Sequence, residues 1–579
     1  MLSALCRVRL ISSISSVRTL EHSERCPQIK SSAVEMSFLG KVFSRNSHSL
    51  TNGEVEFKAC KTSEIKDNEF KVVKKGDYEV LISKHQGEYY ATGTKCTHYG
   101  APLAKGVFKD GRLICPWHNA CFSVTSGDIE DFPAFSQLPC YRVKVKNGDI
   151  WVGGNPVNLN GSQFKLPIKS RGKEFSNQHF IIIGSGAAGY QCAVSLRQLG
   201  FGGEITMLTQ DGEMPYDRTK LSKSLDTPIE NILLKPLDEY KNSEIQIKTS
   251  SGVKSINTKE KNIICDDGTT FSYDKVFLAS GSEPRKLAVP GAELDNIFYL
   301  RDHRDAQKIS KSFADKDVVI CGTSFIGLEI ASSIFKQAKS IVLVGNSKYP
   351  CVHVVGEVIG KALQDLYESK GMRFLNETTI KQFEGENGCV KYAVIDGEKV
   401  PCDVCLVGIG TVPYSQYLKT SNLSLSSSGH VDVNEKMATT VDSIYAGGDL
   451  VKFPLKLYDT HTSIGHWQIA QFHGKVAAHS MLDKTCDTST VPCFWTSLLG
   501  KNLRYAGYSA GHDNIIISGS VENWKFVAQF MKQGKVVAVL TCGYDPLAGL
   551  FKALLMKERW IKEEEIGGVP PQWSIDSSA

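Results

Sequence analysis

The chain has 579 residues, a length that suggests about three to five domains. Its 41% hydrophobic and 22% charged residues are typical of a globular protein with little room for disorder. The formal net charge of +5 is small for this length and is not gathered into a stripe, so no nucleic-acid partner is expected.

The cysteines and the apolar residues argue against two further classes of protein. Seventeen cysteines occur without a repeating spacing, which does not indicate a disulfide framework and fits a reducing compartment. No stretch approaches the ~18 consecutive apolar residues of a membrane-spanning helix, so no transmembrane segment is expected.

The first 20 residues are basic, rich in serine and free of acidic residues. Arg7, Arg9 and Arg18 alternate with leucines and isoleucines, a composition that resembles a mitochondrial presequence. We assign this presequence to residues 1–30 and predict a mitochondrial location, with a disordered tail and a cytoplasmic location as the alternative. A secretory signal is not favoured, because Arg7 and Arg9 interrupt the apolar run.

Residues 54–154 contain short strand-like runs broken by Gly or Asn, which predicts a small all-β module. This module carries the pattern C-x-H, sixteen residues, C-x-x-H, formed by Cys96, His98, Cys115 and His118. Two thiolates and two imidazoles are the ligand set of a Rieske [2Fe–2S] centre. Zinc also accepts two cysteines and two histidines, but zinc fingers pair Cys with Cys and His with His along the sequence.

A linker and then a different kind of sequence follow the β module. Residues 155–176 are polar and contain prolines and glycines, which predicts the linker. The apolar strand at 180–183 then leads into a G-x-G-x-x-G turn, a helix and a second strand at 205–208. This order predicts a dinucleotide-binding fold, in which the glycines let backbone amides and a helix N-terminus approach a pyrophosphate.

A second unit of the same kind begins with the apolar strand at 317–320 and ends with the strand at 340–344. Two further glycine-containing segments, at 279–285 and 444–449, accompany the two units. Each segment alone could be an ordinary glycine turn. The four elements in this order predict two nucleotide sites in one chain.

Together these motifs resemble the two-dinucleotide-domain flavoprotein reductases, within the FAD-dependent pyridine-nucleotide oxidoreductase superfamily. The N-terminal module makes the chain similar to the Rieske-bearing apoptosis-inducing-factor-like flavoproteins, the apoptosis-inducing factor 3 type. The resemblance implies an all-β Rieske module, two α/β dinucleotide-binding domains of the Rossmann-like, glutathione-reductase type, and a C-terminal α+β domain. The implied ranges are 177–300 and 426–488 for the FAD domain, 301–425 for the NAD(P)H domain and 489–579 for the C-terminal domain.

The segment at 215–223, P-Y-D-R-T-K-L-S-K, resembles the flavin-binding signature of this family. The resemblance implies that Arg218 holds a phosphate of FAD and that Lys223 lies at the reactive edge of the flavin, where a cation suits the negative charge of the reduced ring. A solvated surface lysine is the alternative. Glu329 is similar to a family glutamate that pairs with this lysine beside the nicotinamide, so Lys223 and Glu329 are the predicted catalytic residues.

Other positions are assigned to cofactor binding by the same resemblance. Asp449 would bind the ribityl chain of FAD, and Trp467, which follows His466, would line the flavin pocket or pack in an aromatic core. The glycine motifs supply the remaining predicted contacts, which are Gly184, Gly186, Gly189 and Gly281 for FAD and Gly322, Ser324, Gly327 and Glu329 for NAD(P)H.

Three positions depart from the family pattern at the nucleotide sites. Gln210 stands where many relatives have a glutamate for the ribose, with Asp211 next to it. Ser324 replaces the middle glycine of the second motif, so the backbone approaches the nucleotide less closely. Residues 344–346 carry neither the acid that favours NADH nor an arginine for NADPH, so the choice of coenzyme stays open.

The cluster loops depart from those of high-potential Rieske proteins. Ala101 and Trp117 stand where those proteins have two additional cysteines, and Ala120 and Phe122 stand where they have hydroxyl groups against the cluster sulfurs. Each missing hydrogen bond leaves the reduced cluster less stabilised. We therefore predict a potential toward the bottom of the Rieske range of about −150 to +300 mV.

These features predict an NAD(P)H oxidoreductase that passes electrons through FAD and a Rieske cluster to an unknown acceptor, either a protein or a small molecule. His98 and His118 are expected to be the more exposed ligands and therefore the exit route for electrons. The alternative is a mitochondrial, apoptosis-related signalling or interaction protein whose flavin redox state acts as a conformational switch. A DNA-binding effector would need a basic face, and residues 71–75 offer only a short lysine run. The oligomeric state is not predicted.

Overall fold

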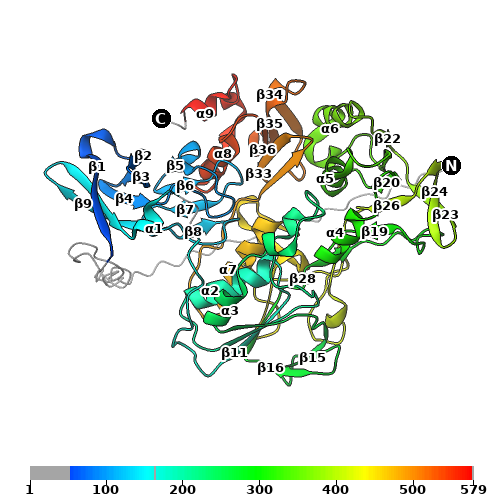
Figure 1. The fold of residues 1–579 in the computed structure, drawn as a ribbon, viewed down its shortest axis with the longest axis horizontal. Coiled ribbons are helices and arrows are strands. Elements are labelled where there is room, and N and C mark those ends of the chain that lie inside the picture. The colour runs from blue at the N-terminus through cyan, green and yellow to red at the C-terminus, as the bar shows by residue number, and fades with distance from the viewer. Residues whose placement is uncertain (1–52, 162–164, 577–579) are drawn as a thin grey trace, which may run out of the picture. The chain divides into compact units, whose positions relative to one another are not determined.

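The structure is a computed structural model that describes residues 53–161 and 165–576 (Figure 1). The predicted presequence at 1–30 lies outside the described residues. No helix within the described ranges is long and apolar enough to cross a membrane.

Two antiparallel sheets form the N-terminal β module. The larger sheet has the order β1-β10-β9-β4-β3-β2, with β1 (Val55–Lys61), β2 (Phe70–Lys75), β3 (Tyr78–His85), β4 (Glu88–Thr92), β9 (Cys140–Lys146) and β10 (Asp149–Gly154). The smaller sheet has the consecutive order β5-β6-β7-β8, with β5 (Val107–Lys109), β6 (Arg112–Ile114), β7 (Cys121–Ser123) and β8 (Ile129–Asp131). Alternate residues of β10 are buried, as in Ile150 and Val152, because successive side chains of a strand point to opposite faces.

The first dinucleotide-binding unit is a parallel sheet of order β13-β12-β11-β17-β29. Its elements are β11 (His179–Ile183), α2 (Ala187–Gln198), β12 (Glu204–Leu208), β13 (Ile245–Lys248), β17 (Lys275–Leu278) and β29 (Ile444–Ala446). Residues 180–183 are all buried, as expected for a parallel strand that is covered on both faces. Strand β29 comes from a much later part of the chain, so two separate segments build this unit.

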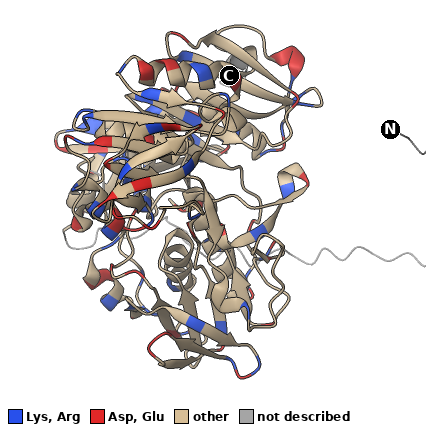
Figure 2. Ribbon diagram, turned by 90° about the vertical axis from the view of Figure 1, so that its right-hand side faces the viewer, with Lys and Arg blue, Asp and Glu red and all other residues tan. Residues whose placement is uncertain are grey.

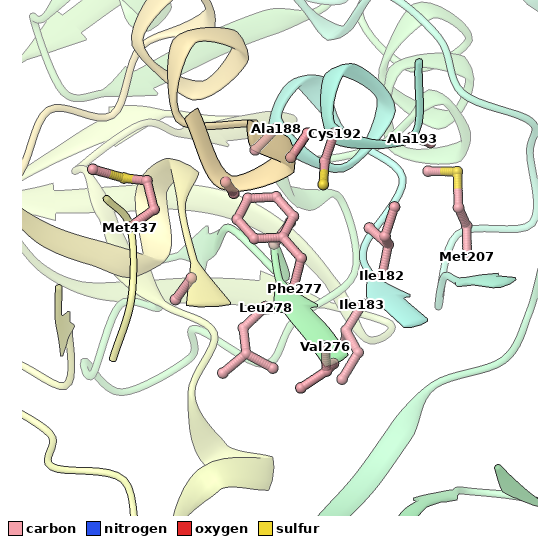
Figure 3. Packing of buried hydrophobic residues seen from close by; sticks show 14 of the residues in the cluster. Ile182, Ile183, Ala188, Cys192, Ala193, Met207, Val276, Phe277, Leu278 and Met437 are labelled. Atoms are coloured by element: carbon pink, nitrogen blue, oxygen red, sulfur yellow. The ribbon is translucent and has the colours of Figure 1, made fainter. Parts of the chain in front are cut away.

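Helix α7 (Trp467–Met481) packs directly on α2. A Cβ atom at Gly474 of α7 would lie 2.2 Å from the carbonyl oxygen of Ala188, so only glycine permits this approach. Phe277 of β17 projects toward the part of α2 that carries Ala188 and Cys192 (Figure 3). The apolar core of this unit therefore holds the glycine turn between β11 and α2 in place.

The second dinucleotide-binding unit is a parallel sheet of order β19-β26-β20-β21-β22. Its elements are β19 (Ile297–Tyr299), α4 (His303–Ser310), β20 (Asp317–Cys321), α5 (Phe325–Ile334), β21 (Ser340–Val344), α6 (Val352–Glu368), β22 (Arg373–Leu375) and β26 (Val404–Val407). The predicted strands at 317–320 and 340–344 are confirmed as β20 and β21. A three-stranded antiparallel sheet accompanies this unit, formed by β23 (Ile380–Glu386), β24 (Cys389–Ile395) and β25 (Glu398–Pro401).

The C-terminal part is an antiparallel sheet with helices. The order is β32-β33-β36-β35-β34, with β37 paired to β36. Its elements are β32 (Cys493–Leu498), β33 (Lys501–Gly507), β34 (Asn514–Ser520), β35 (Lys525–Lys532), β36 (Lys535–Cys542), α8 (Leu547–Leu555), β37 (Ile561–Lys562) and α9 (Gln572–Asp576). The predicted fold class, a β module followed by two α/β units and an α+β part, is confirmed.

Smaller elements connect these parts. They are α1 (Pro156–Leu159), α3 (Leu237–Asn242), β14 (Val253–Asn257), β15 (Asn262–Cys265), β16 (Thr270–Ser272), β18 (Ser282–Pro284), β27 (Thr411–Pro413), β28 (Val431–Asp432), β30 (Val451–Leu455) and β31 (Thr460–Thr462). The predicted residue limits of the domains stay a prediction.

Charged residues of both signs are interspersed along the ribbon (Figure 2). In the short lysine run of β2, Lys71 pairs with Glu64, and Lys74 lies 2.8 Å from a carboxylate oxygen of Glu79. Both of these lysines are therefore neutralised locally.

Candidate functional site

A cavity of about 980 Å³ lies where the two glycine units and the C-terminal sheet meet. Nine of the predicted cofactor-binding residues line it, namely Gly184, Gly186, Arg218, Lys223, Gly281, Ser324, Glu329, Asp449 and Trp467. The remaining three, Gly189, Gly322 and Gly327, lie outside the lining. A Cβ atom at Gly189 would come within 1.9 Å of the Gly184 carbonyl oxygen, and one at Gly327 within 2.0 Å of the Gly322 carbonyl oxygen. These glycines therefore let each helix pack tightly on its own turn.

The turn between β11 and α2 presents backbone to the cavity. Gly184 has a φ of +103°, and a Cβ atom there would lie 2.2 Å from the Ala279 carbonyl oxygen. A Cβ atom at Gly186 would have no neighbour within 4 Å, so the N-terminus of α2 opens onto free space. A helix N-terminus with such access favours a pyrophosphate group.

Arg218 is held at the cavity wall by two hydrogen bonds. Its Nη2 donates to Asp211 Oδ2 at 2.7 Å, and its Nη1 donates to the carbonyl oxygen of Arg301 at 2.8 Å. Asp211 also accepts a 2.8 Å hydrogen bond from the Tyr216 hydroxyl. Asp211 therefore orients an arginine, and both Gln210 and Asp211 line the cavity.

Arg301 is a cavity residue that the sequence motifs did not indicate. A Cβ atom at Gly281 would lie 2.8 Å from its Nη2, so glycine at that position leaves room for the guanidinium. Burial, followed by the nearby charge of Arg218, lowers the pKa of Arg301. Two arginines beside one cavity create a site for an anion, and a pyrophosphate matches the planar guanidinium geometry.

Lys223 and Glu329 form the predicted pair. The Lys223 Nζ lies 2.9 Å from Glu329 Oε1, and the carboxylate is buried. Ser222 donates to the other oxygen of Glu329, and Thr496 of β32 donates to Oε1 at 2.6 Å. Ser222 and Thr496 were not foreseen, and they fix the carboxylate so that it can orient the lysine.

The far wall of the cavity carries buried polar atoms. Asp449 Oδ2 accepts a 2.8 Å hydrogen bond from Ser282. His466 Nδ1 and Trp467 Nε1 are buried and have no hydrogen-bond partner within the described part of the chain. Burial, followed by the charge of Lys223, lowers the pKa of His466 to about 3, so its ring is neutral. Orphaned polar atoms are costly unless something satisfies them, and the polar edge of a flavin ring fits this wall.

The four predicted metal ligands converge at the edge of the smaller sheet. We call residues 96–99, which follow β4, the first cluster loop, and residues 115–119, between β6 and β7, the second cluster loop. His98 Nδ1 and His118 Nδ1 lie 3.0 Å apart, close enough for both to bind one metal ion at the usual metal–nitrogen length of about 2.1 Å. The thiol groups of Cys96 and Cys115 lie within hydrogen-bonding reach of each other.

The donors form two pairs, the thiols of Cys96 and Cys115 and the imidazoles of His98 and His118. This is the division that a Rieske cluster would need, with two cysteines on one iron and two histidines on the other. Burial lowers the pKa of His118 to about 3 and that of His98 well below its usual value, so both rings are neutral and able to bind metal.

Among the four predicted ligands, His118 is partly exposed and His98 is 2% exposed, whereas Cys96 and Cys115 are 0% and 1% exposed. His118 is therefore the most exposed of the four, and the exit route through the histidines stays a prediction. The Trp495 ring lies 4.4 Å from the His118 ring and 5.5 Å from the His98 ring, measured between centroids. Because Trp495 of β32 also lines the large cavity, the histidine side of the candidate cluster site faces this cavity.

Comparison with known proteins agrees with this geometry. Family models match at residues 55–142 (Rieske [2Fe-2S] domain), 178–474 (Pyridine nucleotide-disulphide oxidoreductase) and 493–567 (Reductase C-terminal). The covalent putidaredoxin reductase–putidaredoxin complex gives a TM-score of 0.67 at 26% identity, covering 70% of this chain and 99% of that one. The rubredoxin-NAD(+) reductase of Pseudomonas putida is 29% identical over 366 residues, which are 62% of this chain and 94% of the relative.

Fold, site and comparisons define an NAD(P)H oxidoreductase of the ferredoxin-reductase type that carries a Rieske domain and uses FAD, a [2Fe–2S] cluster and NAD(P)H. Apoptosis-inducing factor 3 of Homo sapiens is 38% identical over 521 residues, which are 88% of this chain and 86% of the relative. The chain belongs to the apoptosis-inducing factor 3 family.

Proposed function

We propose that this protein passes electrons from NAD(P)H through FAD to its own Rieske cluster and from there to an external one-electron acceptor. The observation that carries this proposal is the position of Trp495, which lines the large cavity and packs its ring against His118. When bound, FAD takes a hydride from the nicotinamide and releases electrons singly, and the cluster accepts one electron at a time.

Lys223 and Glu329 are the proposed catalytic residues. The ammonium group of Lys223 offers a positive charge at the edge of the flavin site, where it stabilises negative charge on the reduced ring. Glu329 holds this ammonium group in position, and the hydroxyls of Ser222 and Thr496 keep the carboxylate from turning away.

The remaining residues have proposed roles in cofactor binding. Arg218 and Arg301 supply positive charge for the pyrophosphate of FAD, and the Gly184–Gly186 turn supplies backbone amides. Asp449 accepts from the ribityl hydroxyls, and Trp467 lines the flavin pocket. Ser324 directly precedes α5 and lines the cavity, so the N-terminus of this helix suits the pyrophosphate of NAD(P)H.

We propose a low potential for the cluster. Ala120 and Phe122 are both fully buried beside the second cluster loop and offer no hydroxyl to the cluster sulfurs. Because hydrogen bonds to sulfur stabilise the reduced cluster, their absence at these two positions favours the lower part of the range of about −150 to +300 mV. Such a cluster accepts electrons from a reduced flavin more readily than from a quinol.

A mitochondrial location is proposed from the basic, serine-rich composition of residues 1–30. The acceptor is proposed to be a protein or small molecule that takes single electrons. A signalling role in apoptosis stays the alternative prediction, and slow turnover with a long-lived reduced flavin would favour it.

The test is anaerobic mixing of the purified protein with NADH, and separately with NADPH. Flavin bleaching and the Rieske EPR signal are followed together. The proposal expects both centres to be reduced within one turnover time. Bleaching of the flavin while the cluster stays oxidised would contradict it.

A further inference from the structure

A buried ion pair joins the C-terminal helix α8 to the Rieske module. The Lys552 Nζ lies 3.0 Å from Asp131 Oδ2, and the two side chains are 0% and 4% exposed. Charged side chains are almost never buried this deeply without a partner. The pair therefore marks a place where the two parts of the chain are fitted to each other.

Asp131 is the centre of a complete set of hydrogen bonds. Its Oδ1 accepts from Gln468 of α7 at 2.8 Å and from the backbone amide of Phe132 at 2.8 Å. Its Oδ2 accepts from the Thr490 hydroxyl at 3.1 Å in addition to Lys552. A side chain of the Rieske module is thus held by donors from two other parts of the chain.

Lys552 also reaches the second cluster loop. Its Nζ donates to the carbonyl oxygen of Asn119 at 2.9 Å, and Asn119 directly follows the ligand His118. Burial alone would lower the pKa of Lys552, but the adjacent Asp131 carboxylate raises it above its usual value, so the amine stays charged. Helix α8 also packs closely against the side chain of Asn119, because a Cβ atom at Gly549 would lie 3.2 Å from Asn119 Oδ1.

The energetics of buried ion pairs indicate what this pair does. A buried pair is often no more stabilising than apolar residues of the same size, because removing two charges from water is costly. The contribution of the Lys552–Asp131 pair is therefore geometric, because a charged donor and a fixed acceptor specify one arrangement of the segments that carry them. The arrangement specified here is the position of the second cluster loop relative to Trp495.

We propose that Lys552 is a positioning residue that holds the second cluster loop in register with the flavin site, so that one electron can move from the reduced flavin to the oxidised cluster. This inference rests on the proposed function, since it concerns the step from flavin to cluster. Lys552 does not line the large cavity and does not contact the side chain of a predicted cluster ligand. It acts through Asn119 and Asp131.

The test compares Lys552→Met with Lys557→Met. Lys557 lies just after the same helix and forms a 4.0 Å, half-exposed ion pair with Asp110 of the same module, so it is a matched control. After anaerobic mixing with NAD(P)H, Lys552→Met is expected to reduce flavin at the wild-type rate but to slow cluster reduction by about tenfold or more, because small displacements of reacting groups are costly. Lys557→Met is expected to match wild type in both steps.

A second variant covers the case in which Lys552→Met fails to fold or to take up the cluster. The double variant Lys552→Met, Asp131→Asn leaves no unpaired buried charge, so it is expected to fold. Its cluster reduction by the flavin stays slow, because the Asn119 carbonyl has still lost its donor. Two readouts are independent of turnover: the Rieske EPR line shape, and the cluster potential in a titration with a chemical reductant. Both are expected to shift in the Lys552 variants and not in Lys557→Met.

The outcomes separate this inference from the proposed function. If the wild-type cluster is never reduced by the flavin, the proposed function fails, whatever Lys552 does. If wild type transfers electrons, and the Lys552 variants match it in rate, line shape and potential, then Lys552 is not a positioning residue.

Discussion

The two cluster loops are held in different ways, although each contains one cysteine and one histidine of the proposed cluster site. In the first cluster loop, the Tyr99 ring stacks on the His98 ring at 3.7 Å, and its hydroxyl donates to Asp217. In the second cluster loop, Arg504 donates to the carbonyl oxygen of Trp117 at 2.8 Å. The first loop is therefore fixed by its own side chain and the second by donors to its backbone.

This difference connects the cluster site to two other parts of the chain. Asp217 belongs to the same short segment as Arg218 and Lys223, so the first cluster loop is tied to the segment that we propose to bind the flavin. Lys220 of that segment also lies over the Tyr99 ring at 3.8 Å. Arg504 belongs to strand β33 of the C-terminal sheet, so the second cluster loop is tied to that sheet. We therefore expect the first cluster loop to be sensitive to changes in its own side chains. The second cluster loop should be sensitive to changes in the residues that donate to its backbone.

The largest effect is expected from removal of a ligand. His118→Ala should abolish the Rieske EPR signal and all transfer to one-electron acceptors through the cluster, because one iron loses a nitrogen ligand. Flavin bleaching by NAD(P)H should continue, because His118 does not line the large cavity. EPR and flavin absorbance measured on the same sample check this. A retained Rieske signal would show that His118 is not a ligand.

The next effect concerns the ring that lies between the two sites. Trp495→Leu should slow flavin-to-cluster transfer by about tenfold to a hundredfold, because the contact with both histidines is lost and the distance between the groups is no longer fixed. Stopped-flow measurement of both centres checks this. Phe494→Leu, at the neighbouring position of β32, serves as the control, since Phe494 stacks on Tyr505 and makes no ring contact with either ligand histidine. Equal rates in the two variants would argue against a role for Trp495.

A smaller effect is expected at the second cluster loop. Arg504→Met removes the donor to the Trp117 carbonyl and also the 2.8 Å ion pair with Asp545. It should slow cluster reduction by about tenfold, because a hydrogen bond from a charged donor contributes ~1.5 kcal/mol. Trp117→Phe should leave the rate unchanged, because this side chain is 39% exposed and the loop is held through its backbone. A larger effect of Trp117→Phe than of Arg504→Met would show that the second cluster loop is held by its side chain and not through its backbone.

The smallest effect is expected at the first cluster loop. Tyr99→Phe keeps the stacking on His98 but loses the hydrogen bond to the Asp217 carboxylate, which should cost about 1.5 kcal/mol of stability. Asp217 retains its 2.6 Å hydrogen bond from Thr219, so it is not left without a donor. A urea denaturation curve, monitored by the bleaching of the cluster, checks this. No change in the midpoint would mean that the hydroxyl does not anchor the loop.

The sequence predicted those features that depend on short-range spacing. The four predicted ligands occur in two short loops, and the glycine turns follow apolar strands, so both patterns could be found without a structure. The assignment of the four residues as ligands stays a prediction. Lys223 and Glu329 lie far apart in the chain, and their pairing was implied by the family resemblance. The structure brings them to 2.9 Å of each other.

What the sequence did not predict depends on how distant segments pack. Nothing near Arg301 or Trp495 distinguishes them from ordinary core or surface residues, and their importance comes from lining one cavity. The packing of Trp495 against His118 and His98 was not predicted, because the loop sequence contains no information about what packs on it. The pairing of Lys552 with Asp131 was likewise not predicted, because it depends on the packing of helix α8 against the β module.

We expect the cluster to take electrons from the flavin of the same chain. The most direct test is the rate of cluster reduction after rapid anaerobic mixing with NAD(P)H, measured by freeze-quench EPR over a hundredfold range of protein concentration. Transfer within one chain predicts a first-order rate constant that does not change with concentration. A rate constant that rises in proportion to concentration would show that the cluster is reduced by another molecule, and it would contradict the account.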